Sequence, residues 1–331
     1  MSARVGYVVP VDGVRPREAV ELASLAEQAG FHGVMAADTF QPWLPGLGQA
    51  PQVWPLLGTI AEHIGGDFGV GMAAVGNRMH PASIAQAAAT LAMLHPGRHW
   101  LSIGPGEALH EHVTADYWPE PPVRIARLFE AVDLIRRLFA ASVAGRDVRY
   151  AGEHFSLEST RLWTMPEQPP RVLVATSGPV TARRAGRSAD GLLAVAVQPQ
   201  QAALVLERFR EGVEESGRDH STVSAWLHLN VSWAATDAEA LTQVSERYPM
   251  AAMRFARGDL RSPHVVEQIA KLVRPEDFTG RLLIGADPGL HREQLRDYLD
   301  LGYDRIFVHN VGSNQAAFVQ AYGGDVLPSL G

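Results

Sequence analysis

The sequence predicts an α/β fold, a (β/α)8 or TIM barrel with insertions, which forms one domain over residues 1–331. Apolar strand-like segments alternate with helical segments from one end of the chain to the other, and eight such pairs can be counted. Few of the connections read as hairpins, which favours parallel strands. The length of 331 residues, 46% of them hydrophobic, suits one barrel with insertions. A doubly wound open sheet is the alternative.

Each predicted strand is a short apolar run bounded by glycine, proline or polar residues. These runs are residues 4–9, 33–37, 68–75, 99–103, 171–175, 191–197, 222–235 and 305–311. Helical patterns, several opened by proline, cover residues 16–30, 54–64, 81–94, 124–140, 201–216, 237–248, 291–301 and 314–322, and another begins near 179. Residues 148–157 read as a surface hairpin, 249–275 as an insertion, and 282–286 as a short apolar run.

Composition excludes several classes of protein. The formal net charge is −7 with acidic and basic residues interspersed, so no basic surface for nucleic acid is expected. The chain has no cysteine, which excludes disulfides, thiolate catalysis and cysteine-based metal sites. No window approaches 18 uninterrupted apolar residues, and the first residues lack the apolar core of a signal peptide. We therefore expect a cytoplasmic protein without membrane contact.

Polar and small residues follow directly after the predicted strands. In a barrel, the residues just past each strand gather at one mouth, where this fold carries out its chemistry. They are Asp12, Asp38, the segment 73–76, Glu107, His110, Thr176, Ser177, Gly178 and Gln198. The most informative stretch is 99–110, in which a strand ends at Ile103 and a glycine-rich turn follows. Its glycines allow close approach to the backbone, and Glu107 and His110, three residues apart, share one helical face.

The motif His110-Glu111-His112 raises the question of a metal-dependent hydrolase. Residues two apart on a helical turn face different directions, and the further ligands of such a site are not evident. Gly-x-Ser-x-Gly and Gly-x-x-x-x-Gly-Lys motifs are absent. The sequence therefore predicts no metal ion, no serine nucleophile of that type and no Walker-type phosphate loop.

Several segments resemble the bacterial-luciferase-like superfamily. More closely, they are similar to the branch that uses the deazaflavin coenzyme F420, typified by F420-dependent glucose-6-phosphate dehydrogenases. The segments that carry the resemblance are 38–43, 84–87, 104–111, 178–179 with 185–186, and 189–191. The resemblance implies a homodimeric barrel with F420 lying across the carboxyl ends of the strands, and hydride transfer between F420 and a polar small molecule.

The resemblance also implies roles for individual residues. Asp38 matches an acid near the deazaflavin head, and Ala73-Ala74 fall where the family has a bulge with a non-prolyl cis bond. The full set implied for the cofactor is Asp38, Ala73, Ala74, Gly76, Gly106, Glu107, His110, Thr176, Ser177 and Gly178, the last three around its phosphate. The set implied for the substrate is Asp12, Thr39, Trp43, Val195, Gln198, Arg257 and Arg281.

Departures from the family pattern bear on the substrate and on the base. Alcohol-oxidising members have a histidine where this chain has Thr39, and a threonine and a lysine for the sugar phosphate where it has Val195 and Gln198. Arg281 matches a phosphate-binding arginine, and Arg257 is the candidate to replace a second lysine. These changes disfavour glucose 6-phosphate itself.

The acid–base group is left open among three side chains, Glu107, His110 and Asp12, with Trp43 lining the substrate side. Glu107 is favoured, coupled to His110, because a carboxylate beneath an apolar ring has a raised pKa that suits proton exchange near neutrality. The expected reaction interconverts an alcohol and a carbonyl on a sugar-like molecule, or epimerises it through a ketone. The alternatives are an FMN-dependent monooxygenase and a non-catalytic F420-binding protein.

Overall fold

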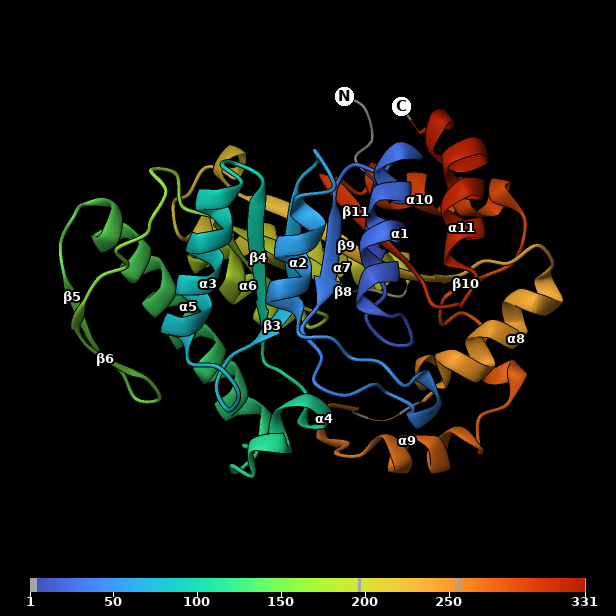
Figure 1. Cartoon of the computed structure of the whole chain (residues 1–331), viewed down its shortest axis with the longest axis horizontal. Helices are drawn as coiled ribbons and strands as arrows, with labels where there is room; N and C mark the ends of the chain where they lie inside the picture. The colour runs from blue at the N-terminus through green and yellow to red at the C-terminus, as the bar shows by residue number, and fades with distance from the viewer. Residues whose placement is uncertain (1–4, 196–197, 254, 256, 331) are drawn as a thin grey trace.

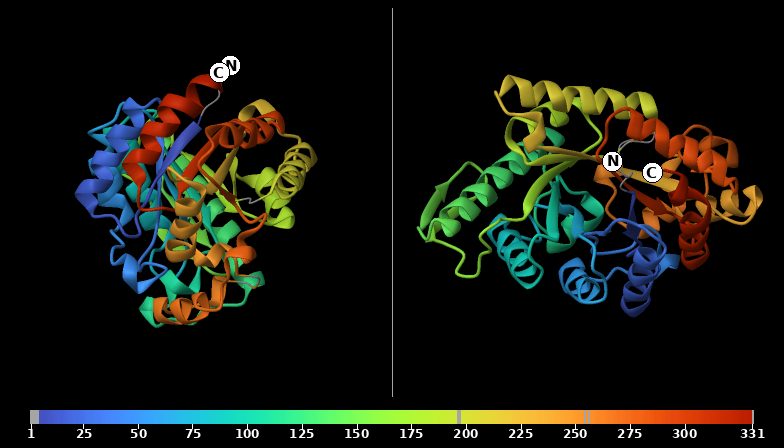
Figure 2. Two further views of the ribbon diagram at one scale, coloured as in Figure 1. Left: turned by 90° about the vertical axis from the view of Figure 1, so that its right-hand side faces the viewer. Right: turned by 90° about the horizontal axis from the view of Figure 1, so that it is seen from above.

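The computed structural model describes residues 5–195, 198–253, 255 and 257–330. Eight parallel strands of this part of the chain close into a barrel, surrounded by helices (Figures 1 and 2). In ring order they are β1 (Val5–Val9), β2 (Val34–Ala37), β3 (Phe68–Ala74), β4 (His99–Gly104), β7 (Arg171–Thr176), β8 (Gly191–Val195), β9 (Ser224–Ser232) and β11 (Arg305–Asn310). Pairing of β8 with β9, which places Val195 opposite His228, closes the ring. The barrel prediction is confirmed, and the open sheet is wrong.

The predicted strands differ from the observed ones mainly at their ends. Residue 4 and residues 196–197, which the sequence assigned to two of the strands, lie outside the described residues. The strand predicted at 222–235 is shorter, because Asp219 accepts a hydrogen bond from the backbone N–H of Ser221 (2.8 Å) and caps a turn there. The apolar run at 282–286 forms the two-residue strand β10 (Leu283–Ile284), which pairs with the end of β9.

Helices cover the outside of the barrel (Figure 2). They are α1 (Pro16–Gln28), α2 (Val53–Ala61), α3 (Pro81–Leu94), α5 (Pro121–Val143), α6 (Pro179–Ser188), α7 (Pro199–Glu215), α8 (Asp237–Arg247), α10 (Pro288–Asp300) and α11 (Gln315–Ala321). Many open on proline, whose missing N–H would have no partner at the first helical position. The predicted starts at residues 124 and 201 were too late for this reason, since Pro121 and Pro199 begin those helices.

The hairpin of β5 (Val148–Ala151) and β6 (Ser156–Thr160) projects from the barrel (Figure 1). Its turn is fixed by the carboxylate of Glu130 on α5. That carboxylate accepts hydrogen bonds from the backbone N–H groups of Glu153 (3.2 Å), His154 (2.9 Å) and Phe155 (2.7 Å). The hairpin predicted at 148–157 is confirmed, with a second strand that runs further than expected.

Large side chains fill the half of the barrel where the strands begin. Trp100 and Trp226 meet edge to face with their ring centroids 4.7 Å apart, and Phe307 packs against both. Gly69 is required beside them, because a Cβ there would lie 2.2 Å from the Trp100 ring. This half of the barrel is thus a packed core, as is usual for the fold.

The segment predicted as an insertion lies below the strand ends in Figure 1. Its described residues include the turns Pro249–Ala251 and Arg257–Asp259 and the helix α9 (Pro263–Ala270); residues 254 and 256 lie outside the described part. Met250, Met253 and Val266 pack there with Leu44 from the loop after β2. This small apolar cluster holds the segment against the mouth.

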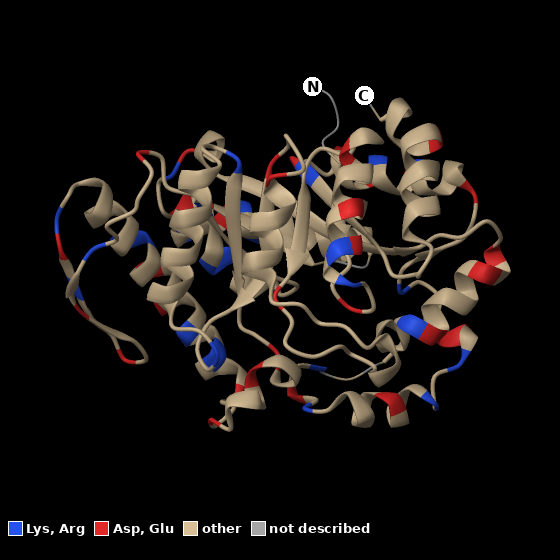
Figure 3. Cartoon of the chain, in the orientation of Figure 1, with Lys and Arg blue, Asp and Glu red and all other residues tan. Residues whose placement is uncertain are grey.

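Acidic and basic side chains are interspersed over the outer elements (Figure 3). Among the described residues, no helix has the length and apolar character needed to cross a membrane.

Candidate active site

A bulge in β3 forms one wall of the mouth. The pairing of β3 with β4 shifts register between Val70 and Ala73, and Met72 takes a φ of +66° to accommodate the extra residue. Ala73 and Ala74 then pair with Ile103 and Gly104. The predicted bulge is confirmed. The cis bond that the resemblance implied is not found: every peptide bond of the described residues is trans, and Met72 supplies the change in chain direction instead.

The turn after β4 carries glycine for a steric reason. Gly106 has a φ of +75°, and a Cβ there would lie 3.1 Å from the side chains of both Ala74 and Glu111. The short helix α4 (Ala108–Glu111) follows, with Glu107 at its N-cap. The Glu107 side chain makes no capping hydrogen bond and is partly buried beside His110.

Glu107 and His110 share a face, as the spacing predicts. His110 Nε2 lies 3.8 Å from Glu107 Oε2, and Trp43 stands edge-on to the imidazole with centroids 6.0 Å apart. The His110 Nδ1 atom accepts a hydrogen bond from the backbone N–H of Phe40 (3.4 Å). Burial, together with the charge of Arg78, lowers the pKa of His110 to about 3. His110 is therefore neutral near pH 7 and can orient a ligand but not hold a second proton.

Asp12 lies at the end of the first strand–helix loop, beside Trp43. Its Oδ2 atom accepts a hydrogen bond from the Trp43 backbone N–H (3.1 Å), and Oδ1 has no hydrogen-bond partner among the described residues. Burial raises the pKa of Asp12 to about 6, against the lowering effect of that N–H. Burial also raises the pKa of Glu107, against the charges of Arg257 and Arg124. Asp12 is thus a carboxyl group suited to proton transfer near neutrality.

Asp38 has a partner that the sequence did not reveal, Arg78 in the loop after β3. The guanidinium donates to both Asp38 oxygens (2.9 and 3.3 Å) and, through Nε, to Glu111 Oε1 (2.6 Å). The Arg78 backbone N–H also donates to Glu111 Oε2 (3.1 Å). Burial raises the pKa of Asp38, and the charge of Arg78 opposes this rise. Arg78 thereby ties β2 to α4 at the mouth, a link that no local pattern in the sequence could indicate.

The turn at Thr176-Ser177-Gly178 stands at the end of β7 and opens the ten-residue helix α6. The Gly178 backbone N–H donates to Thr176 Oγ1 (3.0 Å), and the Ser177 carbonyl accepts from Gln201 Nε2 (3.2 Å). Ser177 is exposed at the rim. The N-terminal end of α6 thus lies at the same mouth, with the positive end of its dipole available to an anion.

The residues expected to replace a sugar-phosphate site separate into two environments. Gln198 Nε2 donates to the Gly280 carbonyl (2.8 Å), which places Gln198 beside the segment that carries Arg281. Arg257 instead lies over the Trp43 ring at 5.9 Å, donates to the Met250 carbonyl (3.2 Å) and faces Glu107.

A cavity of 130 Å³ opens among the ends of β1, β2, β9 and β11. Asp12, Thr39 and Trp43, three of the predicted residues, line it together. Sequence reasoning missed its other polar residues, among them His228, Asn230 and His309, which lie on strands. The alternating pattern of residues 222–235 was the one available signal. Among the described residues, no group of three His, Asp or Glu side chains is placed to hold a metal ion, and the His112 Nδ1 atom bonds the Ala108 carbonyl of its own helix.

A closed parallel barrel with carboxyl groups, a bulge and a glycine turn at its mouth defines a class of (β/α)8 barrel built to hold a ligand there. Residues 3–305 match the model of the luciferase-like monooxygenase family, and the chain belongs to this family.

Curated relatives and solved structures are similar over the full length. The F420-dependent glucose-6-phosphate dehydrogenases of Microbacterium testaceum and Intrasporangium calvum are 31% and 33% identical, each over 99% of this chain and 97% and 98% of their own. An F420-dependent secondary alcohol dehydrogenase solved with an F420-acetone adduct has a TM-score of 0.92 and 26% identity, over 100% of both chains. The F420-dependent tetrahydromethanopterin reductase of Methanopyrus kandleri shares the fold, with a TM-score of 0.80 and 19% identity.

Proposed function

We propose that this protein is an F420-dependent oxidoreductase that transfers a hydride between the deazaflavin and an alcohol or carbonyl carbon of a polar, sugar-like molecule. The observation that carries the proposal is the full-length similarity to relatives named as F420-dependent dehydrogenases. The bulge in β3 and the positive-φ turn at Gly106 shape the wall of the mouth against which a flat, anionic coenzyme would lie. An epimerase acting through a ketone is a variant of the same chemistry.

In this proposal, cofactor binding is shared by two parts of the mouth. Asp38, Ala73, Ala74, Gly76, Gly106, Glu107 and His110 would hold the ring system, and Thr176, Ser177 and Gly178 would hold the phosphate at the start of α6. When bound, F420 supplies a ring carbon that accepts or gives a hydride. The residues of this chain bind it, orient the substrate carbon and move one proton.

We assign the proton transfer to Asp12 in place of Glu107. Asp12 lines the cavity, its Oδ1 atom is unpartnered within the described residues, and Thr39 cannot act as a base. Asp12 would take the alcohol proton at Oδ1 during oxidation and return it during reduction. Glu107, next to His110, would exchange a proton on the coenzyme side. Trp43 would hold the substrate against Asp12 with its ring, while its backbone N–H orients the Asp12 carboxylate.

The test is a titration with F420 in both redox states, followed by a screen of alcohols and ketones for the change in deazaflavin absorbance. Micromolar binding and a substrate-dependent change support the proposal. Binding of FMN without F420, with oxygen consumed by the reduced flavin, would instead identify an FMN-dependent monooxygenase. A non-catalytic F420-binding protein would show rates that Asp12→Asn and Glu107→Gln leave unchanged.

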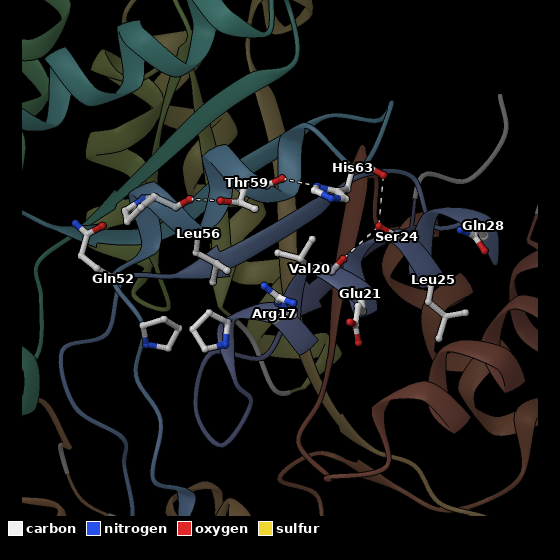
Figure 4. Close-up of a pocket in the computed structure, with 13 residues that line it drawn as sticks. Arg17, Val20, Glu21, Ser24, Leu25, Gln28, Gln52, Leu56, Thr59 and His63 are labelled. Carbon is white, nitrogen blue, oxygen red and sulfur yellow. Dashed lines mark hydrogen bonds between the residues drawn. The ribbon is translucent and has the colours of Figure 1, made fainter.

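We further propose a homodimer that works in the cytoplasm. A groove of 1060 Å³ runs between α1 and α2, with Val20, Leu25 and Leu56 among its apolar lining residues (Figure 4). At the end of the adjacent helix α3, Met93 and Leu94 are 46% and 63% exposed. A groove beside exposed apolar residues such as Met93 and Leu94 is typical of an interface, and a second copy of the chain is the partner we propose. Cell fractionation would test the location.

A further inference from the structure

Three polar side chains from two paired strands form the floor of the mouth cavity. His228 and Asn230 lie two residues apart on β9, so their side chains share the inner face, and β11 places His309 opposite Asn230. The His309 Nδ1 atom lies 2.9 Å from Asn230 Oδ1, and Asn230 Nδ2 donates to the Tyr248 hydroxyl (3.4 Å). The rings of His228 and His309 are 5.8 Å apart. We call His228, Asn230 and His309 the polar floor.

The polar floor is uncharged. Burial and the neighbouring His309 lower the pKa of His228 to about 3, and burial lowers the pKa of His309 to about 4. Neither ring nitrogen of His228 has a hydrogen-bond partner in the described part of the chain. Buried polar groups in native proteins are usually paired, so an unpartnered imidazole beside a cavity indicates a ligand that supplies the missing hydrogen bonds.

The positive charge that lines this cavity is shared with a carboxylate of the same lining. One arginine, Arg247, is among the described residues that line the cavity, and its positive charge lowers the pKa of Asp12. Its guanidinium also packs against Gly13, where a Cβ would lie 2.6 Å from Nη2. Arg257, outside the lining, is held by the Met250 carbonyl and faces Glu107. The Arg247 Nε atom has no hydrogen-bond partner in the described part of the chain, but this single guanidinium would have to offset both the Asp12 carboxylate and the charge of a phosphate.

We infer that the polar floor binds an uncharged, hydroxyl-bearing part of the substrate, so that the substrate is a non-phosphorylated sugar or polyol. A hydroxyl group both donates and accepts, and so matches a neutral imidazole and an amide. The cavity volume of 130 Å³ corresponds to about four water molecules at about 30 Å³ each, which suits the hydroxylated edge of a small ring. This inference rests on the proposed function, because it names the substrate class of the same mouth.

The test compares two sugars that differ by one phosphate. D-glucose, D-glucose 6-phosphate and inorganic phosphate are titrated calorimetrically into the full-length protein, with and without oxidised F420. We expect saturable binding of D-glucose with a dissociation constant at least tenfold lower than that of D-glucose 6-phosphate, and no binding of inorganic phosphate. His228→Phe and Asn230→Ala should each weaken D-glucose binding at least tenfold, while His220→Phe, a control on the exposed surface, leaves it unchanged.

A second measurement uses the wild-type protein, so it does not depend on whether the variants fold. In the wild-type protein, the imidazole NMR signals of His228 and His309 should shift with D-glucose, and those of His220 should not. Tighter binding of D-glucose 6-phosphate than of D-glucose, or no saturation by D-glucose up to 100 mM, would overturn the inference. The sugar titrations without F420 test this inference independently of the proposed function. The proposed function itself fails if the wild-type protein does not bind F420.

Discussion

At the scale of the residue, the mouth contrasts two carboxyl groups with a set of neutral imidazoles. Burial raises the pKa values of Asp12 and Glu107 and lowers those of His110 and His228, because a low-dielectric surrounding disfavours the charged form of each. A carboxyl group with a pKa near 6 can both accept and return a proton at neutral pH. The imidazoles are confined to hydrogen bonding.

The pH dependence of the rate follows from Asp12. If ionised Asp12 accepts the alcohol proton, kcat/KM for oxidation should rise with pH and level off above about 6, the pKa of this group. Asp12→Asn should lower kcat about 10²- to 10⁴-fold and remove this dependence. Rates measured from the deazaflavin absorbance between pH 5 and pH 8 would check it, and a flat wild-type profile would contradict it.

The same group should affect folding stability. Its folded-state pKa lies above its usual value, so ionising it costs stability as the pH rises from about 4 to 6, and the full cost applies above that range. Asp12→Asn should therefore raise the free energy of unfolding at pH 8 relative to the wild type and leave it unchanged at pH 4. Urea denaturation at the two pH values measures the difference; an equal effect at both would rule out ionisation as the cause.

Arg78 offers a second prediction at this scale. Arg78→Ala would leave Asp38 and Glu111 buried without a counter-charge, at a cost of about 3–5 kcal/mol in unfolding free energy. Arg78→Lys keeps the charge but loses the planar guanidinium that donates to Asp38 and Glu111 together. It should weaken F420 binding at least tenfold, with a smaller loss of stability than Arg78→Ala. Urea denaturation and F420 fluorescence titration measure the two effects. Arg137→Ala, at an exposed pair with Asp133, is the control and should cost less than about 0.5 kcal/mol.

At the scale of the element, the loops and short helices of the mouth are held together by side chains from distant segments. Asp259 accepts hydrogen bonds from Trp118 Nε1 and from Arg124 (3.0 Å each). Gln41 Nε2, in the loop after β2, donates to the carbonyl of Leu109 in α4 and to that of Arg261 in the segment 249–275. These bonds fix the segment over the mouth without adding a strand to the barrel.

The glycine turn after β4 gives a prediction for an element. Gly106→Ala places a Cβ 3.1 Å from Ala74 and Glu111 at a positive φ, and Gly97→Ala is the matched control, with a similar φ of +74° and open space around it. Each should lose about 1–2 kcal/mol from backbone strain. Only Gly106→Ala should also weaken F420 binding, because its methyl group would displace Ala74 and Glu111 at the mouth. Equal F420 affinities in the two variants would place the coenzyme elsewhere.

At the scale of the whole molecule, side chains pack the half of the barrel where the strands begin. Ligands and partners therefore have the mouth and the outer faces of the helices as binding surfaces. The proposed dimer uses the face of α1, α2 and α3 (Figure 4). Light scattering should give twice the chain mass for the wild type. Leu25→Glu combined with Leu94→Lys should shift it towards the monomer while the circular dichroism spectrum is retained. A wild-type monomer at micromolar concentration would contradict the proposal.

Much of this architecture was predictable because it follows from the local pattern of apolar and polar residues along the chain. Alternation of apolar runs with proline-opened helices gave the eight barrel strands, and the glycines after Ile103 marked the turn that Gly106 makes. Strand ends were less certain, as at residues 222–235, where the Asp219 side chain caps the start of a turn that takes up residues 220–222. The implied cis bond was wrong, since Met72 takes up the bulge with its own backbone angles.

By itself, the sequence determined the fold class, the residues that follow each strand, and the family that those residues resemble. Only the tertiary structure decided which of them act together. It joined Arg78 to Asp38 and Glu111, turned Arg257 towards Trp43 and Glu107, and set His228 and Asn230 beside His309. The physical reason is that periodicity records which side of an element is buried, whereas pairing of charges and polar groups depends on segments that meet only when the barrel closes.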